Sequence, residues 1–368
     1  MPFPEKLPAD TLRDAEEIIR KRNAENLALR RALEASRRET DTAETIRRTI
    51  FNLAEYTPAP PAWVAGKGIK HGERGGPVLM LSDIHYGEKI DRDQTGGVNE
   101  FNAKIAEARI KRLALTTIDL CENHMGRAGV KYPGLVLCLG GDLIGGDIHD
   151  ELMATNDRTP QQSVNELTDI LAATITTLVN YFGRIFVISV VGNHGRGTKK
   201  LHNKGRVFTN FDWVISCNLE RYFREDKRVQ FMIPNEADAY FQVFGTRFLL
   251  THGDSLGVKG GDGIIGALGP IARGTMKIGN SERQIGRDID YVLGCHYHQL
   301  LWLPNAIFNG CVKGYDEYAR LALRVPYSPP QQALFFVHPE HGITARWAVF
   351  LEQRQSSTQN KVWVSWQQ

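Results

Sequence analysis

The sequence lacks the features that mark secreted, membrane-spanning and disulfide-stabilised proteins. Its five cysteines lie far apart along 368 residues and form no C-x-x-C pair, and an odd number suits reduced thiols. No run of about eighteen apolar residues occurs, and the first residues lack the apolar core of a signal peptide. These absences predict a cytoplasmic protein with no membrane partner.

The sequence also lacks a strong excess of either charge. Its 45 basic residues stand against 42 acidic ones, for a net charge of +3, which is too even to hold nucleic acid by bulk charge. Any binding of phosphate groups must therefore come from a local cluster of basic residues. A G-x-x-x-x-G-K-[ST] loop is absent too, so nothing indicates coupling to hydrolysis of a nucleotide triphosphate.

Proline and glycine are missing from about Asp10 to Tyr56, which predicts an N-terminal helical extension over residues 1–57. Apolar residues recur along this segment with heptad spacing, as at Leu12, Ile19 and Leu33. Such a stripe needs a partner. The helix either packs on the rest of its own chain, forms a coiled coil between subunits of a homo-oligomer, or contacts nucleic acid through its charged residues.

The remaining chain is predicted to contain a Pro/Gly linker over 58–76, a main domain over 77–350 and a C-terminal tail over 351–368. Short apolar runs alternate with helical segments in the main domain, which predicts a layered α/β fold. The expected strands are Val78–Leu81, Leu135–Leu139, Ile185–Val191, Phe248–Leu250 and Tyr291–Leu293, and the expected helices are Phe101–Asn123, Gln161–Phe182 and Asn210–Phe223.

Polar residues follow each of these apolar runs, at the point where a strand would end. Any one of them has an ordinary explanation as a cap, a turn or a hydrogen-bonded histidine. Together they predict a metal site, and the mixture of oxygen and imidazole donors suits manganese, iron or zinc better than calcium or magnesium. The candidates are Asp83, His85, Asp142, Asn193, His252, His296 and His298.

These residues resemble the ordered motifs of the calcineurin-like metallophosphoesterases, which are D-x-H, G-D, G-N-H, a lone His and G-H-x-H. The five motifs occur here in that order between Val78 and Trp302. The resemblance implies a β-sandwich flanked by helices, in an α/β/β/α arrangement, and two divalent metal ions, with Mn²⁺ first and Fe or Zn as alternatives. It further implies that one metal is held by Asp83, His85 and His298, the other by Asn193, His252 and His296, with Asp142 bridging both.

The resemblance also leaves His194 without a metal, so it becomes the candidate catalytic residue that protonates the leaving oxygen or stabilises the transition state. The family commonly has an acidic residue after G-N-H to orient this histidine, but this chain has Gly195. Either another carboxylate therefore takes that role, with Asp150, Glu151 and Asp254 as candidates, or no carboxylate does. Cys295 replaces a usual glycine and is expected to be neither a ligand nor a nucleophile.

A cationic loop, Arg196–Arg206, follows the third motif and suggests a phosphate-rich substrate, with Arg196, Lys199 and Lys200 as the substrate-binding residues. The alternative is a solvated surface loop. A second, glycine-rich segment over Gly253–Arg287 is expected to be a binding loop, a lid or a plain excursion.

Our leading hypothesis from sequence is a metal-dependent phosphodiesterase acting on nucleic acid, a nuclease similar to the DNA repair exonuclease branch of the family, of the phage or prophage type. A phosphomonoesterase or small-nucleotide phosphodiesterase is the alternative enzyme. A hypothesis of another class is a non-catalytic metal-binding or nucleic-acid-binding scaffold, for which Gly195 is the main argument.

Overall fold

The computed structural model describes residues 61–65, 75–125, 132–256 and 268–352. The predicted N-terminal helical extension and nearly all of the predicted tail lie outside these ranges, so the proposed role of the extension in a homo-oligomer stays a prediction. In the described part of the chain, no helix combines the length and the apolar character needed to cross a membrane.

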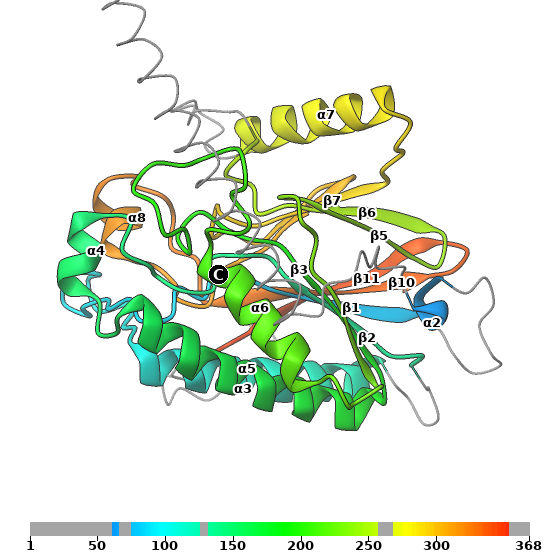
Figure 1. Cartoon of the computed structure of the whole chain (residues 1–368), viewed down its shortest axis with the longest axis horizontal. Helices are drawn as coiled ribbons and strands as arrows, with labels where there is room; N and C mark the ends of the chain where they lie inside the picture. The colour runs from blue at the N-terminus through cyan, green and yellow to red at the C-terminus, as the bar shows by residue number, and fades with distance from the viewer. Residues whose placement is uncertain (1–60, 66–74, 126–131, 257–267, 353–368) are drawn as a thin grey trace, which may run out of the picture. The chain divides into compact units, whose positions relative to one another are not determined.

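Two mixed sheets form the centre of the described fold (Figure 1). The larger has the order β11-β10-β1-β2-β3-β4, and β1 to β4 run parallel to one another. Its strands are β1 (Gly76–Leu81), β2 (Leu135–Leu139), β3 (Ile185–Ser189), β4 (Val229–Met232), β10 (Gln331–His338) and β11 (Gly342–Phe350).

The smaller sheet has the order β5-β6-β7-β9-β8, and β6, β7 and β9 are parallel. Its strands are β5 (Ala239–Val243), β6 (Thr246–Leu250), β7 (Tyr291–Gly294), β8 (Leu301–Trp302) and β9 (Ala306–Phe308). Both sheets therefore have parallel strands whose carboxyl ends can carry functional side chains.

Helices cover the outer face of each sheet, as Figure 1 shows. Three of them pack on the larger sheet: α3 (Ala103–Asp119), continued by a π-helical turn over Leu120–Met125, α5 (Pro160–Phe182) and α6 (Phe211–Tyr222). Helix α7 (Leu268–Gln284) packs on the smaller sheet. The layers are thus α/β/β/α, and the predicted fold class is confirmed. Short helices α2 (Ala62–Ala65), α4 (Asp150–Thr155) and α8 (Glu317–Leu321) complete the described elements.

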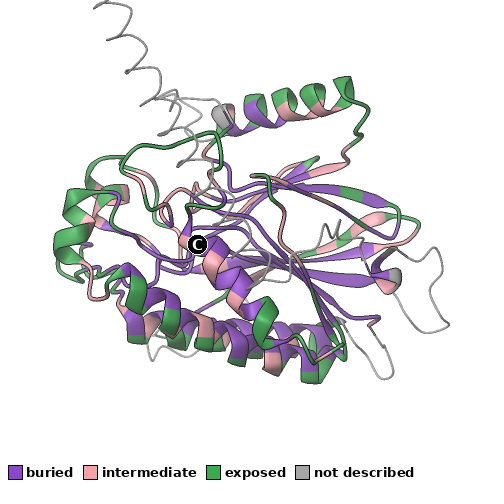
Figure 2. Cartoon of the chain, in the orientation of Figure 1, coloured by how far each residue is buried: buried purple, intermediate pink, exposed green. Residues whose placement is uncertain are grey.

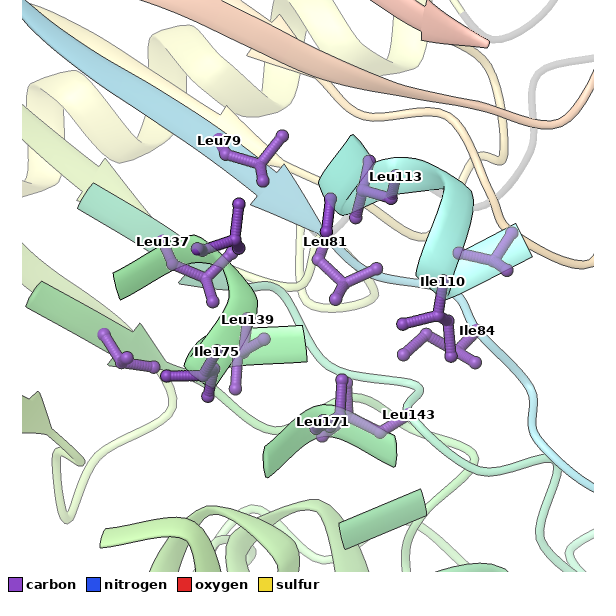
Figure 3. Close-up of a cluster of buried hydrophobic side chains, with 14 of the residues drawn as sticks. Leu79, Leu81, Ile84, Ile110, Leu113, Leu137, Leu139, Leu143, Leu171 and Ile175 are labelled. Atoms are coloured by element: carbon purple, nitrogen blue, oxygen red, sulfur yellow. The ribbon is translucent and has the colours of Figure 1, made fainter. Parts of the chain in front are cut away.

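The apolar strands contribute side chains to two hydrophobic cores, because successive side chains of a strand point to opposite faces. In β1, Leu79 and Leu81 enter the core beneath α3 and α5, whereas Val78 and Met80 enter the core between the sheets. Figure 3 shows the first of these cores, with leucine and isoleucine side chains from strands and helices in contact. Strands β1, β2 and β3 are buried along their whole length, and Figure 2 shows helices buried on the side that faces the sheet.

Helix α5 shows how local sequence fixes the limits of an element. Thr159 accepts a hydrogen bond from the Gln162 amide, and the Gln162 side chain returns to the Thr159 amide, which forms a capping box. Pro160 occupies the first turn, where no amide donor is needed. At the other end Gly183 has a φ of 74°, a left-handed conformation that ends the helix. The prediction for this segment is confirmed to within one residue at its start.

Two helices form in segments for which the sequence analysis predicted a linker or a loop. Helix α2 lies inside the predicted linker, where Val64 is buried between the sheets and its carbonyl accepts the amide of Phe244 at 2.8 Å. Helix α7 lies inside the predicted glycine-rich loop, because Ile271 and Thr275 are buried on one helix face against the smaller sheet and its loops. In both cases tertiary packing outweighs weak local helix propensity.

Candidate metal centre

The side chains predicted as metal ligands come together where strands of both sheets end. Loops after β1, β2 and β3 of the larger sheet meet loops after β6 and β7 of the smaller one. Close backbone approach makes this possible: a Cβ on Gly192 would collide with the Asp142 carboxylate. The residues that converge are Asp83, His85, Asp142, Asn193, His252, His296 and His298.

A first group of donors consists of Asp83, His85 and His298, whose donor atoms lie within 4.8 Å of one another. Nε2 of His85 is 3.2 Å from Nε2 of His298, which in turn is 3.3 Å from Oδ1 of Asp83. Two imidazole nitrogens this close, with a carboxylate oxygen beside them, form a donor set suited to one divalent transition metal.

A second group consists of Asp142, His252 and His296, with the same spacing limit of 4.8 Å. Asn193 joins them, since its Oδ1 lies 3.2 Å from Nε2 of His252. Nδ1 of His252 donates to the Gly140 carbonyl at 2.9 Å, which leaves Nε2 as the nitrogen that faces the other donors. This set also mixes oxygen and imidazole donors.

The Asp142 carboxylate lies between the two groups. Its Oδ1 accepts the His194 backbone amide at 2.6 Å. Its Oδ2 is 3.1 Å from Nε2 of His252 and 3.9 Å from Nε2 of His85. One oxygen is thus fixed by the backbone while the other faces donors of both groups, as a bridging ligand requires.

Burial sets the protonation of these histidines. Desolvation, with the positive charge of Lys313, lowers the pKa of His85 to about 3, and desolvation lowers the pKa of His296 to about 4. Both rings are therefore neutral, which is the form that binds a metal. Burial opposes the charge on His252 as well, but the Asp142 carboxylate raises its pKa to about 10. A cation beside Asp142 would displace that proton.

His194 is not among the predicted ligands, but a nitrogen of its ring lies within 4.8 Å of donor atoms of His85 and Asp142. Its ring centroid is 4.5 Å from that of His85, and Nδ1 donates to the Gly145 carbonyl at 3.0 Å. A backbone carbonyl, rather than Asp150, Glu151 or Asp254, therefore orients this imidazole. Nε2 is the nitrogen left for chemistry.

Asp212 is a buried residue of the site that the sequence analysis missed. It accepts the amides of Asp142 and Gly192 on Oδ2, both at 2.9 Å, and the amide of Leu143 on Oδ1 at 3.1 Å. Burial, with the charge of Asp142, raises its pKa to about 6. A Cβ on Gly195 would lie 2.8 Å from Oδ1 of Asp212, which explains why a glycine occupies that position. The sequence analysis missed Asp212 because this residue lies in the first turn of helix α6 and not at the end of a strand.

An ion pair and hydrogen bonds hold the cationic loop beside the predicted metal ligands. Arg206 pairs with Asp254 at 3.0 Å, and both side chains are largely buried. Arg196 donates to the carbonyls of Asn193, Thr198 and Lys199, so its guanidinium organises the loop itself. Lys199 is exposed and pairs with Asp150 at 3.0 Å.

Lys200 is exposed as well, so both lysines predicted to bind substrate lie at the surface. Cys295, in contrast, is fully buried between the sheets, and burial raises the pKa of its thiol well above the usual range. It contributes to none of the metal-binding groups found in the described residues. All five cysteines are free and buried.

No protein-family model matches the sequence, and no curated protein matches it. Several solved structures are similar, among them a phosphatase and a thiohydrolase. A dimetal phosphatase from Danio rerio has 8% sequence identity and a TM-score of 0.35, over 76% of this chain and 100% of the phosphatase. The sulfate thiohydrolase SoxB from Thermus thermophilus, in complex with glycerol, has 10% identity and a TM-score of 0.30, over 79% of this chain and 57% of SoxB. Similarity this low says nothing about the activity of this chain, whose candidate centre is defined by its own donor atoms.

Proposed function

We propose that this protein is a phosphoesterase that hydrolyses phosphate esters with two divalent metal ions. The observation that carries the proposal is the convergence of two donor groups on the shared Asp142 carboxylate. The donors come from five separate loops, so a structural role for any single loop does not explain their meeting.

The residues present fit such a pair of cations. Asp83 and Asp142 are buried carboxylates, 0% and 1% exposed, and burial without a counter-charge would be costly. Two divalent cations bound about 3.5–4 Å apart polarise a phosphoryl oxygen and lower the pKa of a water molecule toward neutrality. Asp83, His85 and His298 would hold one, Asn193, His252 and His296 the other, and Asp142 both.

His194 would supply the proton that the leaving oxygen needs. The Gly145 carbonyl fixes its Nδ1–H, so the opposite nitrogen can carry and release a proton. The ring is partly exposed, in contrast to the buried His85 against which it packs, so a substrate can reach it. We assign it the role of general acid.

We further propose that the substrate is a nucleic acid and that the native metal is manganese. The exposed lysines of the cationic loop support a polyanionic substrate, since each phosphate contact adds a salt-dependent contribution to affinity. Lys199 and Lys200 lie on a loop that begins directly after His194.

A small phosphate ester is the second candidate. One observation favours it. Arg196, the cation nearest the metal ligands in sequence, donates hydrogen bonds to three loop carbonyls, so those donors are not directed at a nucleic-acid phosphate. The hypothesis of a non-catalytic scaffold loses its main argument, because Gly195 is explained by the nearby Asp212 and His194 is oriented by a carbonyl.

Metal analysis and activity assays of the purified chain test the proposal. Elemental analysis should find two transition-metal ions per chain. With Mn²⁺ added, the protein should hydrolyse bis-nitrophenyl phosphate, and single- and double-stranded DNA and RNA should be compared with nitrophenyl phosphate. Asp142→Ala should lose both metal and turnover. Turnover of small esters alone would reject the nucleic-acid substrate, and absence of metal or of any hydrolysis would reject the phosphoesterase.

A further inference from the structure

A chain of buried charges lies behind the first donor group. Nζ of Lys313 is 2.9 Å from Oε1 of Glu88 and 2.7 Å from Oδ2 of Asp316. The three residues are 4%, 5% and 6% exposed, respectively. None of them belongs to the predicted site, and Glu88 is distant in sequence from the other two, since Glu88 follows β1 and Lys313 and Asp316 follow β9.

Glu88 reaches the ligand His85 through its second carboxylate oxygen. Oε2 of Glu88 is 3.2 Å from Nδ1 of His85, and in the part of the chain that the structure describes neither of these buried atoms has a hydrogen-bond partner. Nε2 of the same ring faces Nε2 of His298. A proton on Nδ1, shared with Glu88, leaves the lone pair of Nε2 directed at the position where the first group would hold a cation.

The fold fixes the lysine in place. Its backbone carbonyl accepts Nη1 of the buried Arg109 at 2.7 Å and Nδ2 of Asn99 at 2.9 Å. Asp316 is held from the other side, because its Oδ1 caps α8 through the amide of Ala319 at 2.7 Å. The backbone of Lys313 and the carboxylate of Asp316 are thus both held in place, with Nζ of Lys313 between Asp316 and Glu88.

The net charge of this cluster is better explained by a role at the metal centre than by a contribution to folding stability. Two carboxylates surround one lysine, so the cluster carries one net negative charge in a buried position, and buried ion pairs contribute little net stability. A nearby cation would compensate that charge. His252 lacks this arrangement, since its outer nitrogen meets the neutral Gly140 carbonyl.

We propose that Glu88, held by Lys313, is a positioning residue that fixes the tautomer of His85 and strengthens the binding of one of the two metal ions. The inference rests on the proposed function, because it needs a metal at the first donor group. A carboxylate acceptor makes an imidazole a better ligand, and loss of such a partner typically weakens metal affinity by about 10–100-fold.

Two variants of Glu88 test this role. Glu88→Gln keeps the length of the side chain but removes its charge, and Glu88→Asp keeps the charge but shortens the reach toward His85. Mn²⁺ titration of the metal-free proteins should show one of two affinities lowered about 10–100-fold in both variants, with the other unchanged. Activity of the variants should return as Mn²⁺ is raised, which a misfolded protein would not show.

Glu166→Gln is the matched control, because Glu166 accepts the hydroxyl of Tyr86, the neighbour of His85, without contacting the imidazole. It should keep both affinities. Unfolding of the metal-free proteins reports on folding, and Glu88→Asp alone carries the test if Glu88→Gln does not fold. Wild-type affinities in the folded Glu88 variants, or equal loss of both metals, would overturn the inference. A wild-type protein that binds no metal would reject the proposed function instead.

Discussion

Most of the residues predicted as ligands have a backbone conformation that is rare for residues with side chains. Positive φ values occur at Asp83 (50°), His85 (52°), Asp142 (51°), His296 (69°) and His298 (56°). In the described chain only Phe244 and Arg324 share this feature among non-glycine residues. Such conformations cost about 1–3 kcal/mol each and persist where surrounding structure enforces them, typically at functional sites. This concentration of strain supports the candidate centre independently of the side chains.

Substitution of His194 separates proton transfer from metal binding. We expect His194→Ala to keep both metal ions, because each of the two donor groups is complete without its imidazole, and to lower kcat by about 10²–10⁴-fold through loss of the general acid. Metal content and steady-state kinetics measure the two effects in one preparation. Unchanged kcat in a metal-loaded His194→Ala protein would contradict the assigned role.

Asp212 is expected to matter mainly for stability. Asp212→Ala would leave three buried amides without an acceptor, those of Asp142, Leu143 and Gly192. At roughly 1–3 kcal/mol for each unsatisfied group, with partial relaxation, we expect a loss of about 3–5 kcal/mol in the free energy of unfolding. Urea denaturation measures it. Asp150→Asn, at an exposed ion pair, should change stability by less than about 1 kcal/mol.

Among the larger elements, the cationic loop should act on substrate affinity alone. Replacing Lys199 and Lys200 with alanine should raise KM for DNA several-fold and flatten its dependence on salt, because fewer counterions are released on binding. Turnover of bis-nitrophenyl phosphate should stay at the wild-type rate, since neither side chain joins the donor groups. Assays of both substrates at several salt concentrations distinguish the two. An unchanged KM for DNA would assign the loop to the solvated surface.

Helix α5 offers a test of the core. Leu171 is 1% exposed and packs beneath the larger sheet (Figure 3). Leu171→Ala should lower the free energy of unfolding by about 2–5 kcal/mol through lost burial and a residual cavity. Leu115→Ala on α3 is the matched control, since that side chain is 54% exposed and should cost less than about 1 kcal/mol. Denaturant unfolding compares them, and equal effects would contradict the packing described here.

Across the whole molecule, the candidate centre joins the loops of both sheets, so metal removal should weaken the entire fold. A ligand at a hundred times its Kd adds about 2.7 kcal/mol to the stability of the folded state. We therefore expect Tm to fall when a chelator is added and to recover with Mn²⁺, as measured by thermal unfolding. The Asp142→Ala protein should show no such shift. A Tm independent of metal in the wild type would argue against a centre built between the sheets.

The sequence predicted some features of this fold better than others, for physical reasons. Strand ends such as those before Asp83 and Asp142 were located correctly because buried strands give continuous apolar runs followed by polar loops. Helix α7 escaped prediction because its glycines lower local helix propensity and only its packed face stabilises it. Glu88 and Asp212 escaped because an isolated acidic residue looks the same in sequence whether it is solvated or buried.

The amino-acid sequence by itself determined which side chains come together at the candidate centre, since strand periodicity and the order of the polar motifs are local properties of the chain. Only the tertiary structure decided how those residues are supported: the Gly145 carbonyl behind His194, Asp212 beside Gly195, and Lys313 behind Glu88. These contacts join loops that are far apart in the chain. The first two depend on neighbouring strands β2 and β3 of the larger sheet, and the third exists because the two sheets pack face to face and bring the loops after β1 and β9 together.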